Sequence, residues 1–134
     1  MALVLPNQGE TIALEALVAK TAGQNLVLRL FKSNTTPSEA TTEASLTEAN
    51  FTGYAAITLT AANWVITAAD PSTAAYAQQV FTSTVGGQNQ PVYGYYLTQV
   101  TSGKLVWVER FSDGPYTIVN NGDEIRVTLN ITLA

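Results

Sequence analysis

Hydrophobic and polar residues alternate with a period of two along most of the chain after residue 25. The clearest example is 125–133, where every odd position is aliphatic and every even position is polar. This period is typical of β-strands that bury one face. Weaker versions of the pattern occur in 26–31, 52–60, 63–67, 78–85, 91–100, 104–111 and 116–119. Because turn-forming residues separate these segments, the pattern predicts a mainly β protein, an antiparallel β-sandwich or jelly roll of about seven to eight strands.

Residues 8–24 follow a helical period instead. Their aliphatic side chains form an approximate stripe, made of Ile12, Leu14, Leu17 and Val18. Glu10 near the start suits the helix dipole, and Gly23 predicts the end of the helix. We therefore expect residues 1–24 to form an N-terminal helical segment, which either covers one end of the core or docks a partner.

A polar stretch rich in Thr, Ser, Ala and Glu, residues 32–50, separates two of the strand-like segments. Roughly twenty residues is long for a loop inside a compact domain, and such loops are usually functional or mobile. The run Thr36-Pro37-Ser38-Glu39 predicts a capped helical turn, and 45–48 predicts a second one. The composition is uniform on both sides, so we expect 1–134 to form one domain. In it, 32–50 would be an extended loop that orders against a neighbouring subunit.

Aromatic residues concentrate in 91–100 and 104–111. The alternation divides the first segment between two faces, with Tyr93, Tyr95 and Leu97 on one and Tyr96 on the other. Gly94 predicts a bulge or a close approach of two backbones. We expect Trp107 in the core and one or two tyrosines partly exposed. Exposed rings can anchor a protein interface or stack on a sugar, and both uses stay open at this point.

The chain has no cysteine and no histidine. This excludes disulfides, thiolate or histidine zinc sites, and Ser-His-Asp or Cys-His catalysis. The acidic residues that a carboxylate or calcium site would need lie near two turns: Glu109, Asp113, Asp123 and Glu124. Asp113-Gly114-Pro115 and Asn121-Gly122-Asp123 are typical turn sequences. We therefore predict no catalytic residue, no metal and no cofactor, and we expect Glu109 to belong to a surface or interface pair next to Arg110.

Charged residues make up only 12% of the chain, against 46% hydrophobic ones, and the net charge is −4. The six basic residues are scattered, whereas binding to a phosphate backbone needs them clustered. No segment reaches the length of a membrane span, and the first residues lack the basic region of a secretory signal. We predict that the protein binds neither nucleic acid nor membranes and has no small-molecule substrate. A surface with so few charges suits contact with other protein.

Four short blocks occur in a characteristic order. They are a Leu-rich strand followed by Thr-Pro-Ser within 26–38, Phe-Thr-Gly-Tyr-Ala at 51–55, Tyr-Gly-Tyr-Tyr at 93–96, and Glu-Arg-Phe-Ser-Asp-Gly-Pro at 109–115. In this order the chain resembles a family of small structural proteins from the virions of tailed phages. The resemblance covers about 26–133 and implies a virion structural protein, not an enzyme.

Among virion roles, the sequence favours a capsid cement (decoration) protein. Such a protein needs a compact β-core, an uncharged contact surface and no disulfides, because it assembles in the reducing cytoplasm of the bacterial host. The resemblance implies the major capsid protein as partner, a homotrimer, and a location on the capsid surface. The alternative is a tail or fibre module that binds a host glycan or another tail protein. A wall-degrading glycosidase is a third, weaker reading.

Loop position and expected exposure nominate nine interface residues. They are Thr36, Pro37, Glu39, Leu46, Phe51, Tyr54, Tyr96, Arg110 and Asp113.

Overall fold

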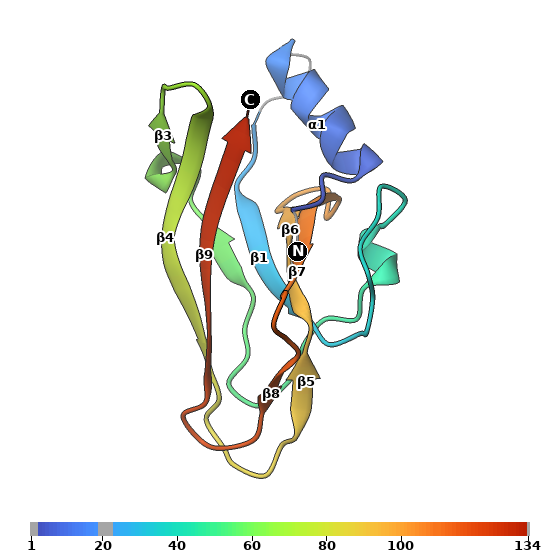
Figure 1. The fold of residues 1–134 in the computed structure, drawn as a ribbon, viewed down its shortest axis with the longest axis vertical. Coiled ribbons are helices and arrows are strands. Elements are labelled where there is room, and N and C mark those ends of the chain that lie inside the picture. Colours follow the sequence, from blue (N-terminus) through green and yellow to red (C-terminus); the bar gives the residue numbers. More distant parts are fainter. Residues whose placement is uncertain (1–2, 19–22, 134) are drawn as a thin grey trace.

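A computed structural model describes residues 3–18 and 23–133 (Figure 1). This part of the chain is mainly β, with antiparallel strands and one α-helix, α1 (Asn7–Leu17). The first sheet has the order β2-β1-β6-β7 and comprises β1 (Leu26–Phe31), β2 (Ile57–Leu59), β6 (Gly94–Gln99) and β7 (Leu105–Arg110). The second has the order β3-β4-β9 and comprises β3 (Val65–Thr67), β4 (Ser72–Thr82) and β9 (Glu124–Leu133). A third, two-stranded sheet pairs β5 (Gln90–Val92) with β8 (Tyr116–Ile118).

The two larger sheets enclose the main core, as the period-two pattern predicts. Its largest fully buried members come from β1, β2, β6, β8 and β9: Leu28, Leu30, Leu59, Leu97, Ile118 and Leu129. In β9 the inward positions Ile125, Val127 and Leu129 are buried, whereas Leu133 at the strand's end is 77% exposed. The core therefore ends before β9 does, and this end of the sandwich stays open.

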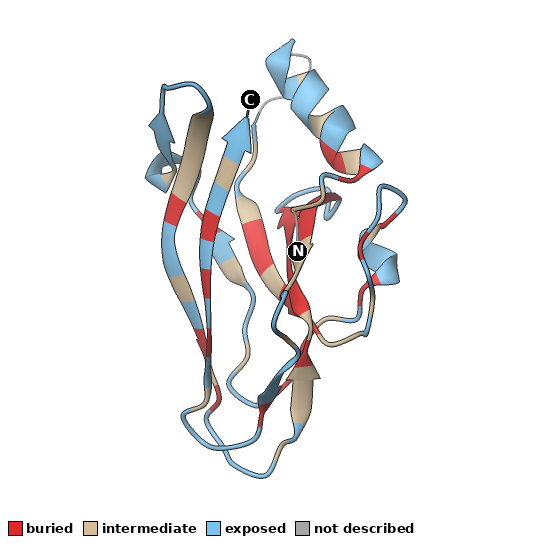
Figure 2. Cartoon of the chain, viewed as in Figure 1, coloured by how far each residue is buried: buried red, intermediate tan, exposed pale blue. Residues whose placement is uncertain are grey.

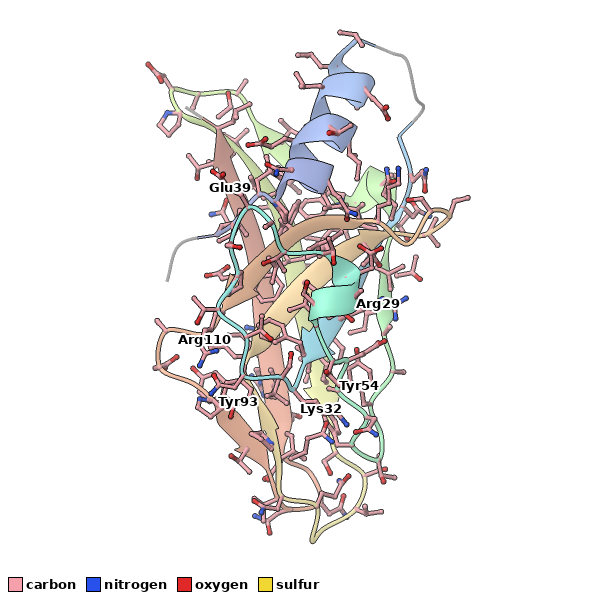
Figure 3. The ribbon with its side chains drawn as sticks, turned by 90° about the vertical axis from the view of Figure 1, so that its right-hand side faces the viewer. Arg29, Lys32, Glu39, Tyr54, Tyr93 and Arg110 are labelled. Carbon is pink, nitrogen blue, oxygen red and sulfur yellow. The ribbon has the colours of Figure 1, made fainter. Side chains whose placement is uncertain are left out.

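The first sheet is buried on both of its faces. All six residues of β6 are buried, and β1 and β7 are buried along most of their length (Figure 2). The face turned away from the main core carries a second cluster of buried side chains: Phe31, Leu46, Tyr96, Leu105 and Val108. Leu46 is the member that does not belong to a strand. It lies in residues 32–50, which we call the strap, and the strap covers this outer face (Figure 3).

The segment 91–100, which the sequence pattern predicts as one strand, is divided at Tyr93 into the end of β5 and β6. A Cβ on Gly94 would lie 2.6 Å from the ring of Phe31 and would also collide with the carbonyl oxygen of Glu109. The predicted close backbone approach at Gly94 is therefore confirmed. The break also changes the faces: Tyr95 and Leu97 enter the main core as expected, but Tyr93 packs against the second cluster, on the side of Tyr96.

Two other strand boundaries differ from the sequence pattern. Residues 72–77, for which the alternation predicts no strand, and the first part of the predicted strand 78–85 form one long strand, β4, which a bulge between Tyr76 and Gln79 interrupts. The segment 52–60 contributes only three residues, Ile57–Leu59, to β2. Short 3₁₀ turns occupy Glu43–Ser45 (η1) and Ala61–Asn63 (η2).

Helix α1 ends at Leu17, earlier than the predicted stop at Gly23, and residues 19–22 lie outside the described part of the chain. The aliphatic stripe of the helix does not face the core as a unit. Only Ile12 of the stripe packs against the core, while Leu14, Leu17 and Val18 are 62%, 81% and 69% exposed. The reason is the close contact of Gly9 with β7, because a Cβ there would collide with the Val106 carbonyl group. This contact fixes the helix rotation and turns the larger aliphatic residues outward.

Candidate interaction surfaces

Arg110 at the end of β7 holds the first part of the strap in place. Its guanidinium group donates hydrogen bonds to the carbonyl oxygen of Thr35 (3.0 Å) and to Oδ1 of Asn34 (2.8 Å). It also lies over the ring of Tyr93, 4.9 Å from the ring centre, which is a favourable cation–π distance. Figure 3 shows this contact near one end of the strap. Arg110 therefore has a structural role within the chain, and it does not pair with Glu109.

A second polar cluster holds the far end of the strap. Arg29 of β1 contacts both carboxylate oxygens of Glu48 at 2.9 Å, and the Tyr54 hydroxyl donates to Oε1 of the same carboxylate at 2.8 Å. That hydroxyl also accepts the backbone N–H of Leu30 at 3.2 Å. Burial, then the contact with Glu48, raises the pKa of Tyr54 well above its ordinary range. Burial likewise raises the pKa of Tyr96 to about 12, with a further contribution from Glu48.

The strap's backbone is paired with its own domain. The N–H of Lys32 donates to the Thr47 carbonyl oxygen (2.8 Å), and the N–H of Ala49 donates to that of Leu30 (2.9 Å). These bonds continue the sheet beyond the end of β1. The predicted ordering against a neighbouring subunit is therefore not needed, because the strap already packs on the sheet beneath it.

The capped turns that we predicted in the strap are displaced. Residues 36–39 are not helical; instead, Thr41 accepts the Ser38 N–H through its hydroxyl and donates its own N–H to the Ser38 carbonyl oxygen. The second turn occurs as η1, earlier than the predicted 45–48, with a capping box between Thr42 and Ser45.

The structure separates the nine predicted interface residues into three groups. Four are buried inside the chain, which leaves them no surface for a partner: Pro37, Leu46, Phe51 and Tyr96. Leu46 and Tyr96 pack in the second cluster and Phe51 packs in the main core, so these side chains contact the rest of the chain. Tyr54 and Arg110 are half-buried in the two polar clusters above. Thr36, Glu39 and Asp113 are exposed and remain candidates.

The acidic residues that we considered for catalysis or calcium binding have separate local roles. Glu109 accepts a 2.6 Å hydrogen bond from the Tyr95 hydroxyl, and burial, followed by this bond, raises the pKa of Tyr95. Asp113 accepts from the Tyr116 hydroxyl. Asp123 accepts the backbone N–H groups of Asn120 and Val119, which lower its pKa and close the turn that these residues form. In residues 3–18 and 23–133 no three acidic side chains gather as a metal site would require.

The open end of the sandwich carries an apolar groove of about 770 Å³. One wall is the end of the second sheet, where Ile66, 72–74 and 130–133 line it. The opposite wall comes from the N-terminal segment, through Leu3, Leu5, Gly9, Ile12, Ala13 and Ala16, and Val106 and Trp107 also line the groove. No lining residue is charged. Exposed aliphatic residues surround it, including Ile66 at 68% and Leu133 at 77%.

A smaller and more polar pocket of about 380 Å³ lies on the other side of α1. The half-buried ring of Trp64 lines it, together with three amide side chains and one charged residue of each sign: Gln8, Gln24, Gln99, Glu15 and Lys104.

The described helices include none that is long and apolar enough to cross a bilayer.

Sequence reasoning found neither the groove nor the pocket. One signal for the groove was available in the alternation of 125–133, which continues to the end of β9. It predicts that Leu133 is buried, yet Leu133 is exposed, so the inner face of the strand is uncovered at that end. Comparisons with protein-family models, with curated proteins and with solved structures gave no match.

Proposed function

We propose that this chain is a structural protein of a phage virion, a capsid cement protein that binds the assembled shell of the major capsid protein. The observation that carries the proposal is the open end of the sandwich, where an uncharged groove lies among strongly exposed aliphatic residues such as Ile66 and Leu133. An exposed apolar surface of this kind is typical of protein-binding sites. The order of the four sequence blocks supports the virion context.

Cementing follows from linkage. A protein that binds the assembled shell, and not the separated subunits, stabilises the shell by mass action. Repetition over many sites on a particle adds up modest contacts, and a homotrimer would place three binding ends around one shell axis. The sparse charges of the chain suit such apolar contact, because few charged groups lose their hydration on binding.

Purified virions test the proposal. We expect the protein in many copies per particle, and we expect particles that lack it to release their genome at a lower temperature. Adding the purified protein back should restore the release temperature of complete particles. Copy number by gel densitometry, with a nucleic-acid dye to report release, measures both effects. Absence from virions would refute a structural role, and a handful of copies per particle would instead indicate the tail.

The smaller pocket favours the second candidate, a tail or fibre module that binds a host glycan. Trp64 offers an aromatic ring, and the amides of Gln8, Gln24 and Gln99 offer the donors and acceptors that sugars need. Tyr95 does not serve this role, because it is buried in the core. Glycan-array binding that Trp64→Ala removes would favour this candidate, whereas an array without binding by wild-type protein would argue against it.

A further inference from the structure

We propose that the smaller pocket, beside α1, binds an uncharged sugar that carries an acetamido group. This inference rests on the second candidate function, because it names the class of ligand that the same pocket takes. Three features of the pocket support it: an aromatic ring that is held in place, amide side chains whose orientation is fixed, and a lining without net charge.

The aromatic ring is that of Trp64. It meets the ring of Tyr76 at 5.1 Å and 67° and the ring of Trp107 at 5.9 Å and 72°, both edge to face. Trp64 is half-buried, so these contacts hold its ring while part of it lines the pocket. A ring that is fixed before binding loses little conformational freedom when a sugar stacks on it.

Two of the pocket's glutamines hold the turn between β6 and β7, residues 100–104. Oε1 of Gln8 accepts the backbone N–H of Leu105 at 3.2 Å. Oε1 of Gln24 accepts the backbone N–H of Thr101 at 3.1 Å. Because a backbone N–H only donates, these bonds decide which end of each amide is the oxygen and which is the nitrogen.

Gln99 at the end of β6 has the same arrangement. Its Oε1 accepts the hydroxyl of Ser102 at 2.6 Å, and that hydroxyl in turn accepts the N–H of Lys104 at 3.2 Å. Within residues 3–18 and 23–133, the amide nitrogens of the three glutamines have no hydrogen-bond acceptor, and they are accessible to solvent. These nitrogens are the polar atoms that the glutamines offer to the pocket, so a ligand must bring acceptors.

The rest of the lining decides which sugar fits. One acidic and one basic residue line the pocket, Glu15 and Lys104, so no net charge attracts an acidic sugar. The remaining surface is largely aliphatic, from Ile12, Leu26 and Val106 among others. An acetamido group matches both parts, because its carbonyl oxygen accepts from an amide nitrogen and its methyl group covers aliphatic surface. The volume of about 380 Å³ is at the small end of the range for ligand sites, so we expect a single sugar ring.

Tryptophan fluorescence measures the binding. The chain has two tryptophans and Trp107 is only 5% exposed, so a change caused by an added sugar reports on Trp64. N-acetylglucosamine and glucose are matched probes, because they differ only in an acetamido group or a hydroxyl at C2. We expect N-acetylglucosamine to bind roughly fivefold more tightly than glucose. Glucuronic acid should bind no more tightly than glucose, because its carboxylate loses hydration without a net positive charge nearby.

Gln24→Glu removes one donor and keeps the turn in place, since its carboxylate still accepts the Thr101 N–H. We expect it to weaken binding of N-acetylglucosamine by roughly threefold or more. Gln78→Glu is the control: it adds the same charge at an exposed position of β4 outside the pocket, and should bind within about twofold of wild type. Thermal melting shows whether both variants are folded. In wild-type protein, the side-chain amide NMR signals of Gln8, Gln24 and Gln99 should shift when the sugar is added.

Equal binding of N-acetylglucosamine and glucose would overturn the acetamido assignment and leave the glycan candidate standing. Tighter binding of glucuronic acid would overturn it as well. Equal affinities of Gln24→Glu and Gln78→Glu, or glutamine amide signals that do not shift, would refute the role of the amide donors. If none of the three sugars binds at about 100 mM, this inference and the glycan candidate fail together. The capsid cement proposal is tested separately, by copy number in virions.

Discussion

The guanidinium group of Arg29 contacts both carboxylate oxygens of Glu48, each at 2.9 Å, and thereby joins β1 to the far end of the strap. Both side chains are about one third exposed, so water screens the pair in part. The Tyr54 hydroxyl shares the carboxylate and makes the pair one part of a small network.

We expect a double-mutant cycle of Arg29→Ala and Glu48→Ala to give a coupling free energy of about 1 kcal/mol, the upper end for a partly exposed pair. Urea unfolding of the four proteins measures it. The ion pair of Arg126 with Glu124 is the control: it is more exposed and bridges residues of one strand, so its coupling should be near zero. Equal couplings for the two pairs would mean that the strap contact contributes nothing specific.

Arg110→Ala should loosen the first part of the strap. The substitution removes two hydrogen bonds to 34–35 and the contact with the Tyr93 ring, so we expect a loss of roughly 1–2 kcal/mol in the free energy of unfolding. Arg110→Lys keeps the charge but not the forked geometry, and should recover less than half of the loss. A stability unchanged from wild type in Arg110→Ala would show that these contacts are dispensable.

Leu46→Ala tests whether the strap is part of the folded core. Its side chain is buried against Phe31, Tyr96 and Val108, and truncation should cost about 2–4 kcal/mol. The strap of the free wild-type protein should resist limited proteolysis, whereas the variant should be cut within 33–48 before the sandwich unfolds. Leu17→Ala, at an exposed position, serves as control and should change stability by less than about 0.5 kcal/mol. Cleavage of the wild-type strap at the variant's rate would contradict the packing.

Gly94→Ala should be strongly destabilising, because even a Cβ meets the ring of Phe31 and the backbone of Glu109. We expect a loss of about 3 kcal/mol or insoluble protein. Gly86→Ala is the matched control, since the nearest atom to its new Cβ is 3.7 Å away. Soluble yield and urea midpoints compare the two, and similar stabilities would show that β1 and β7 can move apart at low cost.

The buried tyrosines predict a loss of stability at alkaline pH. The pKa values of Tyr54, Tyr95 and Tyr96 are all raised in the fold from an ordinary value of 10.0, with burial as the first cause. The folded state favours the neutral form of these tyrosines more than the unfolded state does. Their contribution to the free energy of unfolding is therefore complete below pH 10 and is lost as the pH rises through the folded pKa values. Tyrosinate absorbance followed together with circular dichroism should show these three ionising only as the protein unfolds. Full ionisation of all six tyrosines near pH 10 in folded protein would refute this.

Sequence reasoning succeeded where the information was local. The alternation of 125–133 fixes which face of β9 is buried, and the missing side chain of Gly94 marks a contact that no other residue permits. It failed where distant packing decides. The aliphatic stripe of α1 points outward because Gly9 approaches β7 closely, and a helical period does not reveal that contact. The strap resembles a linker because only scattered positions, such as Pro37 and Leu46, turn inward.

The place of the strap in the chain has a consequence for folding order. The strap follows β1 directly, yet the surface on which it packs comes largely from β6 and β7, between Gly94 and Arg110. During synthesis it therefore emerges long before its docking surface exists. A hydrophobic segment exposed during this interval would be prone to aggregation. The polar composition of 32–50 keeps the strap hydrated until the sheet beneath it is complete. The polar composition that makes 32–50 resemble a linker therefore suits a segment that packs on the sheet only after β6 and β7 have formed.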